Sequence, residues 1–209
     1  MMKQAGWAYV VFCVLTAVSL ETFAAEPSPS GRVEIAGLGI SFDAPAGWFN
    51  VPIDLAENLK RSGLSAEERR RLLMSSKRGV VLSSFQKYDP KKTAGPIPTV
   101  NVLALPFNAK QSKQLLTSVR RSMDEGSKSL PSFAYLLEPR WVKAAGIDSV
   151  EVVVQYNIPL PGGTAALIRA RTLVIPAGAQ LFQVSFTEPA SENNDLAYQA
   201  FERSIVVAR

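Results

Sequence analysis

Apolar and polar residues alternate through much of the second half of the chain, and a period of two indicates β-strands with one buried face. The alternation is clearest in residues 150–158 and 181–187. In the first segment the predicted buried face holds Val150, Val152, Val154 and Tyr156. In the second, the predicted inward residues are Phe182, Val184 and Phe186, and the predicted outward residues are Gln183, Ser185 and Thr187.

Other short segments rich in β-branched and apolar residues are also predicted to be strands. They are residues 33–35, 38–42, 80–88, 99–105, 133–137, 141–144 and 165–175, the last with Arg169 and Arg171 on one face. Proline and glycine at 159–163 and 176–178 predict tight turns between consecutive strands. Short connections of this kind indicate antiparallel pairing.

A period of three to four residues predicts the helices. Residues 109–125 carry one apolar stripe, made of Leu115, Leu116, Val119 and Met123. A final helix is predicted to be capped by Ser191, with Ala197, Phe201 and Ile205 on its buried side, Asp195 in its first turn and Arg203 near its end. Two more helices are predicted at 53–61 and 65–78, the second opening on a capping box formed by Ser65 and Glu68.

These elements predict an α+β fold in which an antiparallel sheet is flanked by helices that bury their apolar stripes on it. We expect one domain over residues 33–209, preceded by a flexible leader at 25–32 that is rich in proline, serine and glycine. The length that remains is enough for a real apolar core without crosslinks.

The first 24 residues have the pattern of a secretory signal peptide. Lys3 precedes an apolar run from Trp7 to Leu20, and small residues follow at Ala24 and Ala25. The run is shorter than the roughly 20 residues that span a bilayer, so an uncleaved anchor is the weaker interpretation. We therefore expect a periplasmic protein, cleaved after Ala24 or Ala25.

The chain has no histidine, and its one cysteine, Cys13, lies within the signal peptide. A Ser-His-Asp triad, a Cys-His dyad and a Cys/His zinc site are all excluded by this inventory. We expect a non-catalytic protein with no catalytic residue, no metal and no cofactor. The alternative is a hydrolase that depends on carboxylates or lysine. Ser84 and Lys87 match a Ser-x-x-Lys pattern, but they lie on a predicted strand, where that chemistry cannot be assembled.

Positive charge is concentrated between Lys60 and Lys92, a stretch that contains ten basic and three acidic residues, whereas the whole chain has a net charge of +5. Such an excess attracts anionic partners. We expect the binding residues to be Arg69, Arg70, Arg71, Lys77, Arg78, Lys91 and Lys92, with Trp141 as a stacking candidate. The expected partner is a protein of the cell envelope, or else anionic lipid or lipopolysaccharide. Nucleic acid is not expected, because the chain is exported and aromatics do not interleave with its basic residues.

The segment Phe42-Asp43-Ala44-Pro45-Ala46-Gly47-Trp48 resembles the opening of PsbP-like and DcrB-like proteins, in which an aromatic residue precedes a Pro-x-Gly-Trp turn. The order at the end of the chain is similar as well: strand 167–175, turn 176–178, strand 181–186 and a final helix ending at 204–206. The superfamily also includes the Mog-type Ran-binding proteins.

The resemblance implies an α/β/α sandwich and a role in binding or assembly rather than catalysis. It assigns structural roles to Phe42, Pro45, Gly47 and Trp48 and carries over no catalytic residue. Bacterial DcrB-like members are often lipoproteins, whereas this chain lacks a lipobox cysteine. The function expected from the sequence is therefore that of an exported accessory protein with an assembly or chaperone-like role.

Overall fold

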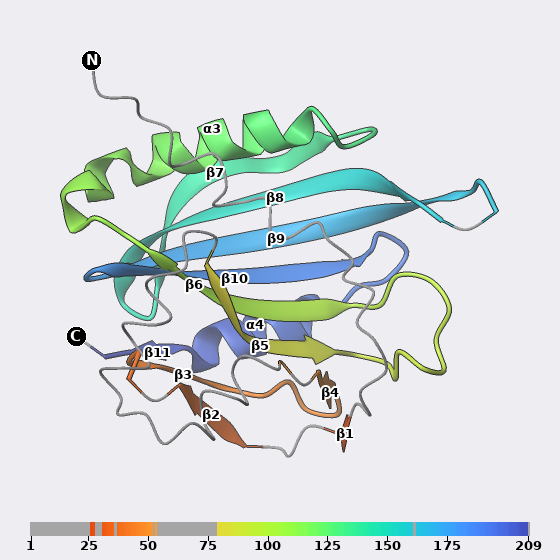
Figure 1. The fold of residues 1–209 in the computed structure, drawn as a ribbon, viewed down its shortest axis with the longest axis horizontal. Helices are drawn as coiled ribbons and strands as arrows, with labels where there is room; N and C mark the ends of the chain where they lie inside the picture. The colour runs from red at the N-terminus through yellow and green to blue at the C-terminus, as the bar shows by residue number, and fades with distance from the viewer. Residues whose placement is uncertain are drawn as a thin grey trace.

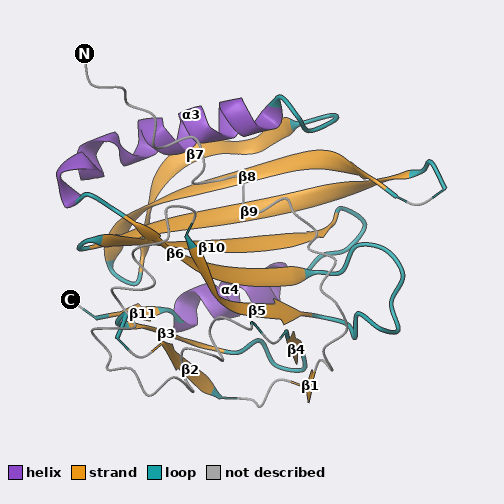
Figure 2. Ribbon diagram, viewed as in Figure 1, coloured by secondary structure: helices purple, strands orange, loops and turns teal. Residues whose placement is uncertain are grey.

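The structure is a computed structural model that describes residues 26–27, 31–35, 37–51, 53, 79–160 and 162–208. Within these residues the chain forms an eight-stranded sheet whose neighbouring strands are all antiparallel (Figure 1, Figure 2). From edge to edge the strands are β1 (Glu26–Pro27), β4 (Phe49–Asn50), β5 (Val80–Gln86), β6 (Thr99–Pro106), β10 (Gln180–Pro189), β9 (Ala165–Ala177), β8 (Ile147–Pro159) and β7 (Ala134–Ala144).

A smaller sheet is formed by β11 (Val206–Val207), β3 (Ile40–Asp43) and β2 (Arg32–Ile35), in that order. The described helices are α3 (Leu115–Ser127), which follows the 3₁₀ segment η2 (Ala109–Gln114), and α4 (Asp195–Ser204). Helix α3 lies along the β7 and β8 side of the large sheet (Figure 1). Helix α4 and the small sheet cover the opposite face.

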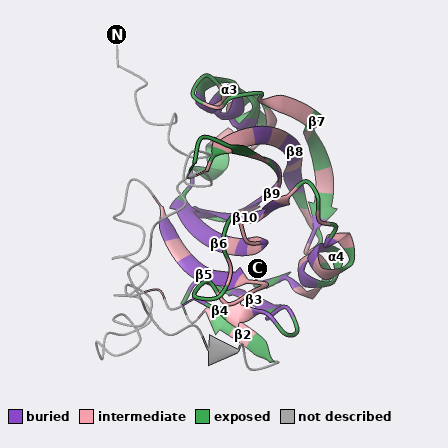
Figure 3. Ribbon diagram, turned by 90° about the vertical axis from the view of Figure 1, so that its right-hand side faces the viewer, coloured by how far each residue is buried: buried purple, intermediate pink, exposed green. Residues whose placement is uncertain are grey.

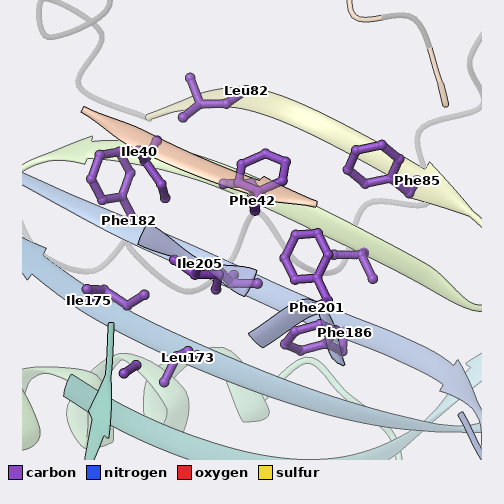
Figure 4. Close-up of a cluster of buried hydrophobic side chains, with 14 of the residues drawn as sticks. Ile40, Phe42, Leu82, Phe85, Leu173, Ile175, Phe182, Phe186, Phe201 and Ile205 are labelled. Carbon is purple, nitrogen blue, oxygen red and sulfur yellow. The ribbon is translucent and has the colours of Figure 1, made fainter. Parts of the chain in front are cut away.

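Each face of the large sheet has its own apolar core, because successive side chains of a strand point to opposite faces. The core under α4 contains Phe182, Val184 and Phe186 of β10, with aromatic rings from β3, β5 and α4 (Figure 4). The core under α3 contains the buried stripe of that helix packed on Val150, Val152, Val154 and Tyr156 of β8. The predicted α+β fold, with helices on the two faces of an antiparallel sheet, is confirmed.

The Pro-x-Gly-Trp segment is a tight turn, as the sequence predicts. The amide of Trp48 donates to the carbonyl of Pro45 at 3.1 Å, and Gly47 has φ 74°, a left-handed value that favours glycine. The turn delivers Trp48 to the core under α4, where its ring stacks edge-on against Tyr198 at 6.1 Å. Phe42, Pro45 and Trp48 are all buried, in keeping with the structural roles that the resemblance implies.

Some predicted boundaries are wrong. Residues 133–137 and 141–144 are not two strands, because β7 runs unbroken from Ala134 to Ala144 and absorbs Pro139 in a stretch of shifted register. Helix α4 is capped at Asn194 rather than at Ser191, which lies in the preceding turn. Residues 176 and 177 extend β9 instead of forming the turn. The final helix was predicted to end at 204–206, but α4 ends at Ser204, Ile205 is extended and Val206 belongs to strand β11 (Val206–Val207).

Gln183 and Ser185 were predicted to lie on the outward face of their strand, and that face is not exposed to solvent. Both are on the face of β10 opposite Phe182, as the alternation requires, yet both are 0% exposed. Leu181, which shares that face, belongs to the core under α3, so this face of β10 is covered just as the face under α4 is. The alternation predicted the correct side for each residue but not the burial of that side.

Several predictions concern residues outside the described part of the chain. They are the signal peptide with its cleavage site, most of the leader, and the helices at 53–61 and 65–78. In the part that is described, no helix combines the length and the apolar character that crossing a membrane requires.

Candidate functional site

A hollow of about 590 Å³ opens at the end of the sheet where the β7–β8 and β9–β10 turns lie. Most of its lining is apolar, and volumes of this size are typical of ligand sites. Three separate segments supply the lining residues: the stretch from Phe107 to Lys113, the β7–β8 hairpin, and the end of β9 with the turn that follows it. The lining residues are Phe107, Ala109, Ser112, Lys113, Trp141, Ile147, Asp148, Pro176 and Gly178.

The β7–β8 turn fixes one wall of the hollow. Only two residues, Ala145 and Gly146, connect the strands, and both have positive φ, at 50° and 73°. Two successive residues with positive φ give a hairpin turn whose twist matches that of the strands. The register that follows sets Trp141 opposite Val150, and Val150 belongs to the core under α3. Trp141 therefore lies on the α3 side of the sheet.

The segment that follows β6 fixes a second wall. The amide of Phe107 donates to the carbonyl of Ala179 at 2.9 Å, which ties this segment to the β9–β10 turn. Asn108 then starts η2 by accepting a hydrogen bond from the amide of Lys110 at 3.1 Å. Phe107 is buried at the base of this wall, whereas Lys113 is exposed in the last turn of η2.

Trp141 is the dominant side chain of the hollow, and it is 45% exposed. A tryptophan so placed offers a flat apolar surface and an N–H donor, a combination that is enriched at binding sites. The other exposed large apolar side chains in the described part of the chain are Leu136, Leu167, Leu196 and Val206. Trp141 lies on strand β7, and the stacking role expected for it from the sequence stays a prediction.

The rim of the hollow carries a positive excess. Asp148 accepts from Lys143 at 2.7 Å, and both side chains are largely exposed. Lys113 makes no ion pair with any described residue. Lys113 lines the hollow without such a pair, whereas Lys143 is paired with the lining residue Asp148, so these three side chains carry a net positive charge. The apolar floor therefore lies beside a cation that can accept an anionic group.

The predicted basic site is only partly described. Lys91 and Lys92 are exposed in the loop between β5 and β6, which lies at the opposite end of the sheet from the hollow (Figure 1). Lys92 is 3.6 Å from Asp89 in that loop. The structure does not bring these lysines near Trp141. The other predicted binding residues, Arg69, Arg70, Arg71, Lys77 and Arg78, are outside the described residues, so their joint surface remains a prediction.

A charged network beneath α4 was missed by the sequence analysis. Glu188 of β10 is 1% exposed and accepts hydrogen bonds from Arg169, while Asp195 lies within 4 Å of both Arg169 and Arg171. The signal was present, because Glu188 is the next inward position after Phe186 in the alternation. A carboxylate in an inward register requires a buried partner. Of the described residues, none form a group of three or more acidic, cysteine or histidine side chains suited to holding a metal ion.

No family model and no curated protein matches the chain. Its fold is similar to those of several solved structures. Cyanobacterial PsbP (CyanoP) from Synechocystis sp. PCC 6803 is 14% identical with a TM-score of 0.49, over 93% of this chain and 99% of that one. LpqN, described as involved in cell envelope biogenesis of Mycobacterium tuberculosis, is 14% identical with a TM-score of 0.47, over 87% of each chain.

A third similar structure is PA94, a protein of unknown function from Pseudomonas aeruginosa. It is 15% identical with a TM-score of 0.46, over 63% of this chain and 84% of that one. A PsbP is thus one of the solved structures to which this chain is similar.

Proposed function

We propose that this protein is a non-catalytic accessory protein of the bacterial cell envelope, and that it holds a protein partner by an apolar side chain seated in the hollow beside Trp141. The observation that carries the proposal is the exposed Trp141 ring above an apolar floor, with a cationic rim. Interface anchors are most often aromatic residues seated in pockets of this kind. The compartment follows from the predicted signal peptide.

The shape of the hollow favours a partner side chain over a free small molecule. Trp141 is nearly half exposed even though it lines the hollow. Sites for free ligands generally enclose most of the ligand surface. An open hollow covers one face of its occupant and leaves the rest to a larger contact surface, which a protein partner provides.

Site-specific photo-cross-linking in intact cells tests the proposal. A photoreactive amino acid placed at Ser112 or at Asp148 lies in the lining of the hollow, whereas one at Glu125 lies on the exposed side of α3 as a control. We expect both hollow positions to yield the same protein adduct and Glu125 to yield none. Trp141→Ala should lower that yield by at least about fivefold, as expected for an anchor residue. An adduct that also forms at Glu125 and is insensitive to Trp141→Ala would overturn the proposal.

A further inference from the structure

Strand β7 is one of the two edges of the large sheet, and no described strand lies beyond it (Figure 3). An edge strand presents unpaired main-chain N–H and C=O groups, which can pair with another chain. At 11 residues β7 is long for an edge strand. Two of the exposed large apolar side chains of the described residues, Leu136 and Trp141, lie on it.

The two halves of β7 differ. From Tyr135 to Arg140 the register against β8 shifts twice, and Pro139 lacks an N–H group. Shifted registers and proline are the usual means by which an edge is made unsuitable for pairing. From Arg140 to Ala144 the register runs without interruption, from Arg140 opposite Glu151 to Ala144 opposite Ile147. The regular half is also the half that carries Trp141 and borders the hollow.

The direction of the main-chain groups follows from the turn. A two-residue hairpin turn is closed by a hydrogen-bonded pair, here Ala144 and Ile147, and hydrogen-bonded and non-bonded pairs then alternate. Val142 is therefore bonded to β8, whereas Trp141 and Lys143 belong to non-bonded pairs. Their N–H and C=O groups point away from β8 toward the free edge. The two residues also share the face of the sheet that borders the hollow.

We infer that the partner joins the sheet as an antiparallel strand along Arg140–Ala144, with an apolar side chain over Trp141 and an acidic residue opposite Lys143. In such a pairing the residues opposite Trp141 and Lys143 are two positions apart and point to the same side. The partner segment thus has the order acidic residue, any residue, apolar residue. The positive rim formed by Lys113 and Lys143 against one carboxylate, Asp148, selects the acidic residue.

This inference rests on the proposed function, and it adds the binding mode and the chemistry of the partner. Strand addition of this type takes affinity from main-chain hydrogen bonds and specificity from pockets for alternate side chains. Trp141 contributes to both affinity and specificity, because its main-chain groups face the free edge and its side chain lines the hollow. The hollow and the edge are then parts of one site.

A synthetic peptide of sequence Thr-Val-Glu-Val-Phe-Val-Thr is the probe, with amide NMR spectra of the full mature protein as the readout. We expect hydrogen exchange at the Trp141 and Lys143 amides to slow by at least about tenfold on saturation, since both become hydrogen-bonded. The amide of Val142, already bonded to β8, should be unaffected. Replacing the peptide's glutamate with lysine should weaken binding about two- to fivefold. N-methylation of the peptide groups that face β7 should weaken it by at least about tenfold.

Lys143→Pro removes the outward N–H without removing a bond to β8, and proline is tolerated at such edge positions. Lys143→Pro should weaken peptide binding by at least about tenfold. Lys143→Ala, the matched control for the lost charge, should weaken peptide binding only about two- to fivefold. Unchanged near-ultraviolet circular dichroism from the buried Trp48 verifies that Lys143→Pro still folds.

The outcomes separate the two proposals. Peptide binding that depends on Trp141 but tolerates both N-methylation and Lys143→Pro overturns strand addition and leaves the proposed function standing. Insensitivity of both cross-linking and peptide binding to Trp141→Ala overturns both. A concentration-dependent dimer of the free protein that Lys143→Pro makes monomeric identifies a second copy as the occupant and overturns the inferred partner. Failure of every acidic-x-apolar peptide to bind at millimolar concentration overturns it as well.

Discussion

A single carboxylate, Glu188, fastens the start of α4 to the large sheet. One of its oxygens accepts from Nε of Arg169 at 2.8 Å and also from Nη2 of the same residue. The other accepts from the main-chain amide of Asn194 at 3.1 Å and from the side-chain Nδ2 at 2.7 Å. Every acceptor position of this buried group is thus directed at a donor, which is the condition under which a buried charge is tolerated.

Glu188→Gln should therefore destabilise the protein strongly, by about 2–4 kcal/mol, because an amide offers one acceptor oxygen and turns an N–H toward existing donors. Urea unfolding measures the change. The matched control is Glu138→Gln, which breaks another arginine–glutamate pair, but one whose partners, Glu138 and Arg120, are both exposed. We expect no resolvable change there. Equal effects of the two substitutions would show that burial does not determine how much these ion pairs contribute to the free energy of unfolding.

Substitution of the buried Gln183 is expected to raise stability rather than lower it. It is 0% exposed, its amide nitrogen donates to the hydroxyl of Ser185 at 3.1 Å, and its side-chain oxygen has no hydrogen-bond partner among the described residues. A buried acceptor without a donor costs about 1–3 kcal/mol. Gln183→Met keeps the shape and removes that cost at the expense of one hydrogen bond, so we expect stability to rise by about 1 kcal/mol in thermal unfolding. Gln155→Met, at a partly exposed position of β8, is the control. Destabilisation at position 183 would contradict the prediction.

The contrast between these residues shows how far the sequence can be interpreted. The alternation in 181–187 assigned each side chain to its correct face, because that depends only on the local backbone. The burial of Gln183 and Ser185 depends on what covers the second face of the strand, and the local sequence pattern contains no information on that. The hollow could not be predicted from the sequence for the same reason, because residues 107–113, 141–148 and 176–178 come together only in the folded sheet. Trp141 alone was identified, by its residue type and its charged neighbours.

Helix α4 and the turn before it contain two acidic groups whose titration affects stability in opposite directions. Glu192 accepts from Lys87 and from the Tyr88 hydroxyl, each at 3.0 Å, which ties the end of β5 to this turn. Burial alone would raise the pKa of Glu192, but the hydrogen bonds from Lys87, Tyr88 and Asn194 outweigh it and lower the pKa below the ordinary value of 4.5. Glu202 of α4 has its pKa raised, first by burial and then by repulsion from Glu151.

A lowered pKa in the folded state means that Glu192 contributes stability above about pH 4.5 and loses it as the pH falls through the folded-state pKa. We expect Glu192→Gln to destabilise the protein at pH 7 and to have a progressively smaller effect as the pH falls below 4.5. Urea midpoints measured between about pH 3 and pH 7 test this. A difference from the unmodified protein that stays constant over this range would contradict the assignment.

For Glu202 the sign reverses. A raised pKa means that the folded state holds the proton more tightly, so this group contributes stability at low pH and loses it as the pH rises through the folded-state pKa. Glu202→Gln, which stays uncharged, should therefore stabilise the protein at pH 7 and have little effect near pH 4. The same pH series measures it, with Glu192→Gln as the internal comparison. Destabilisation at pH 7 would show that the contacts of Glu202 with Arg171 and Arg203 outweigh its burial.

The two sheets and α4 share one aromatic cluster, and this sharing bears on how the molecule unfolds. Phe42 of β3 is 0% exposed, and its ring centroid lies 6.2 Å from that of Phe85 on β5 and 5.1 Å from that of Phe201 on α4 (Figure 4). The cluster therefore joins the small sheet, the large sheet and the helix directly. If these contacts couple the layers, the loss of Phe42 weakens all of them together rather than freeing the small sheet alone.

Phe42→Ala should lower the free energy of unfolding by about 3–5 kcal/mol, the usual cost of emptying a fully buried phenylalanine site. A chain that lacks residues 1–24, and with them Trp7, allows two single-tryptophan reporters that follow the layers separately. Trp141→Phe leaves Trp48 in the core under α4, and Trp48→Phe leaves Trp141 on β7. Within each reporter background, Phe42→Ala should shift the urea midpoint by the same amount, because one transition unfolds both regions. Leu196→Ala, at an 81% exposed position of α4, should shift neither. A shift confined to the Trp48 reporter would mean that α4 and the small sheet unfold as a unit of their own, and that Phe42 stabilises this unit rather than the whole sheet.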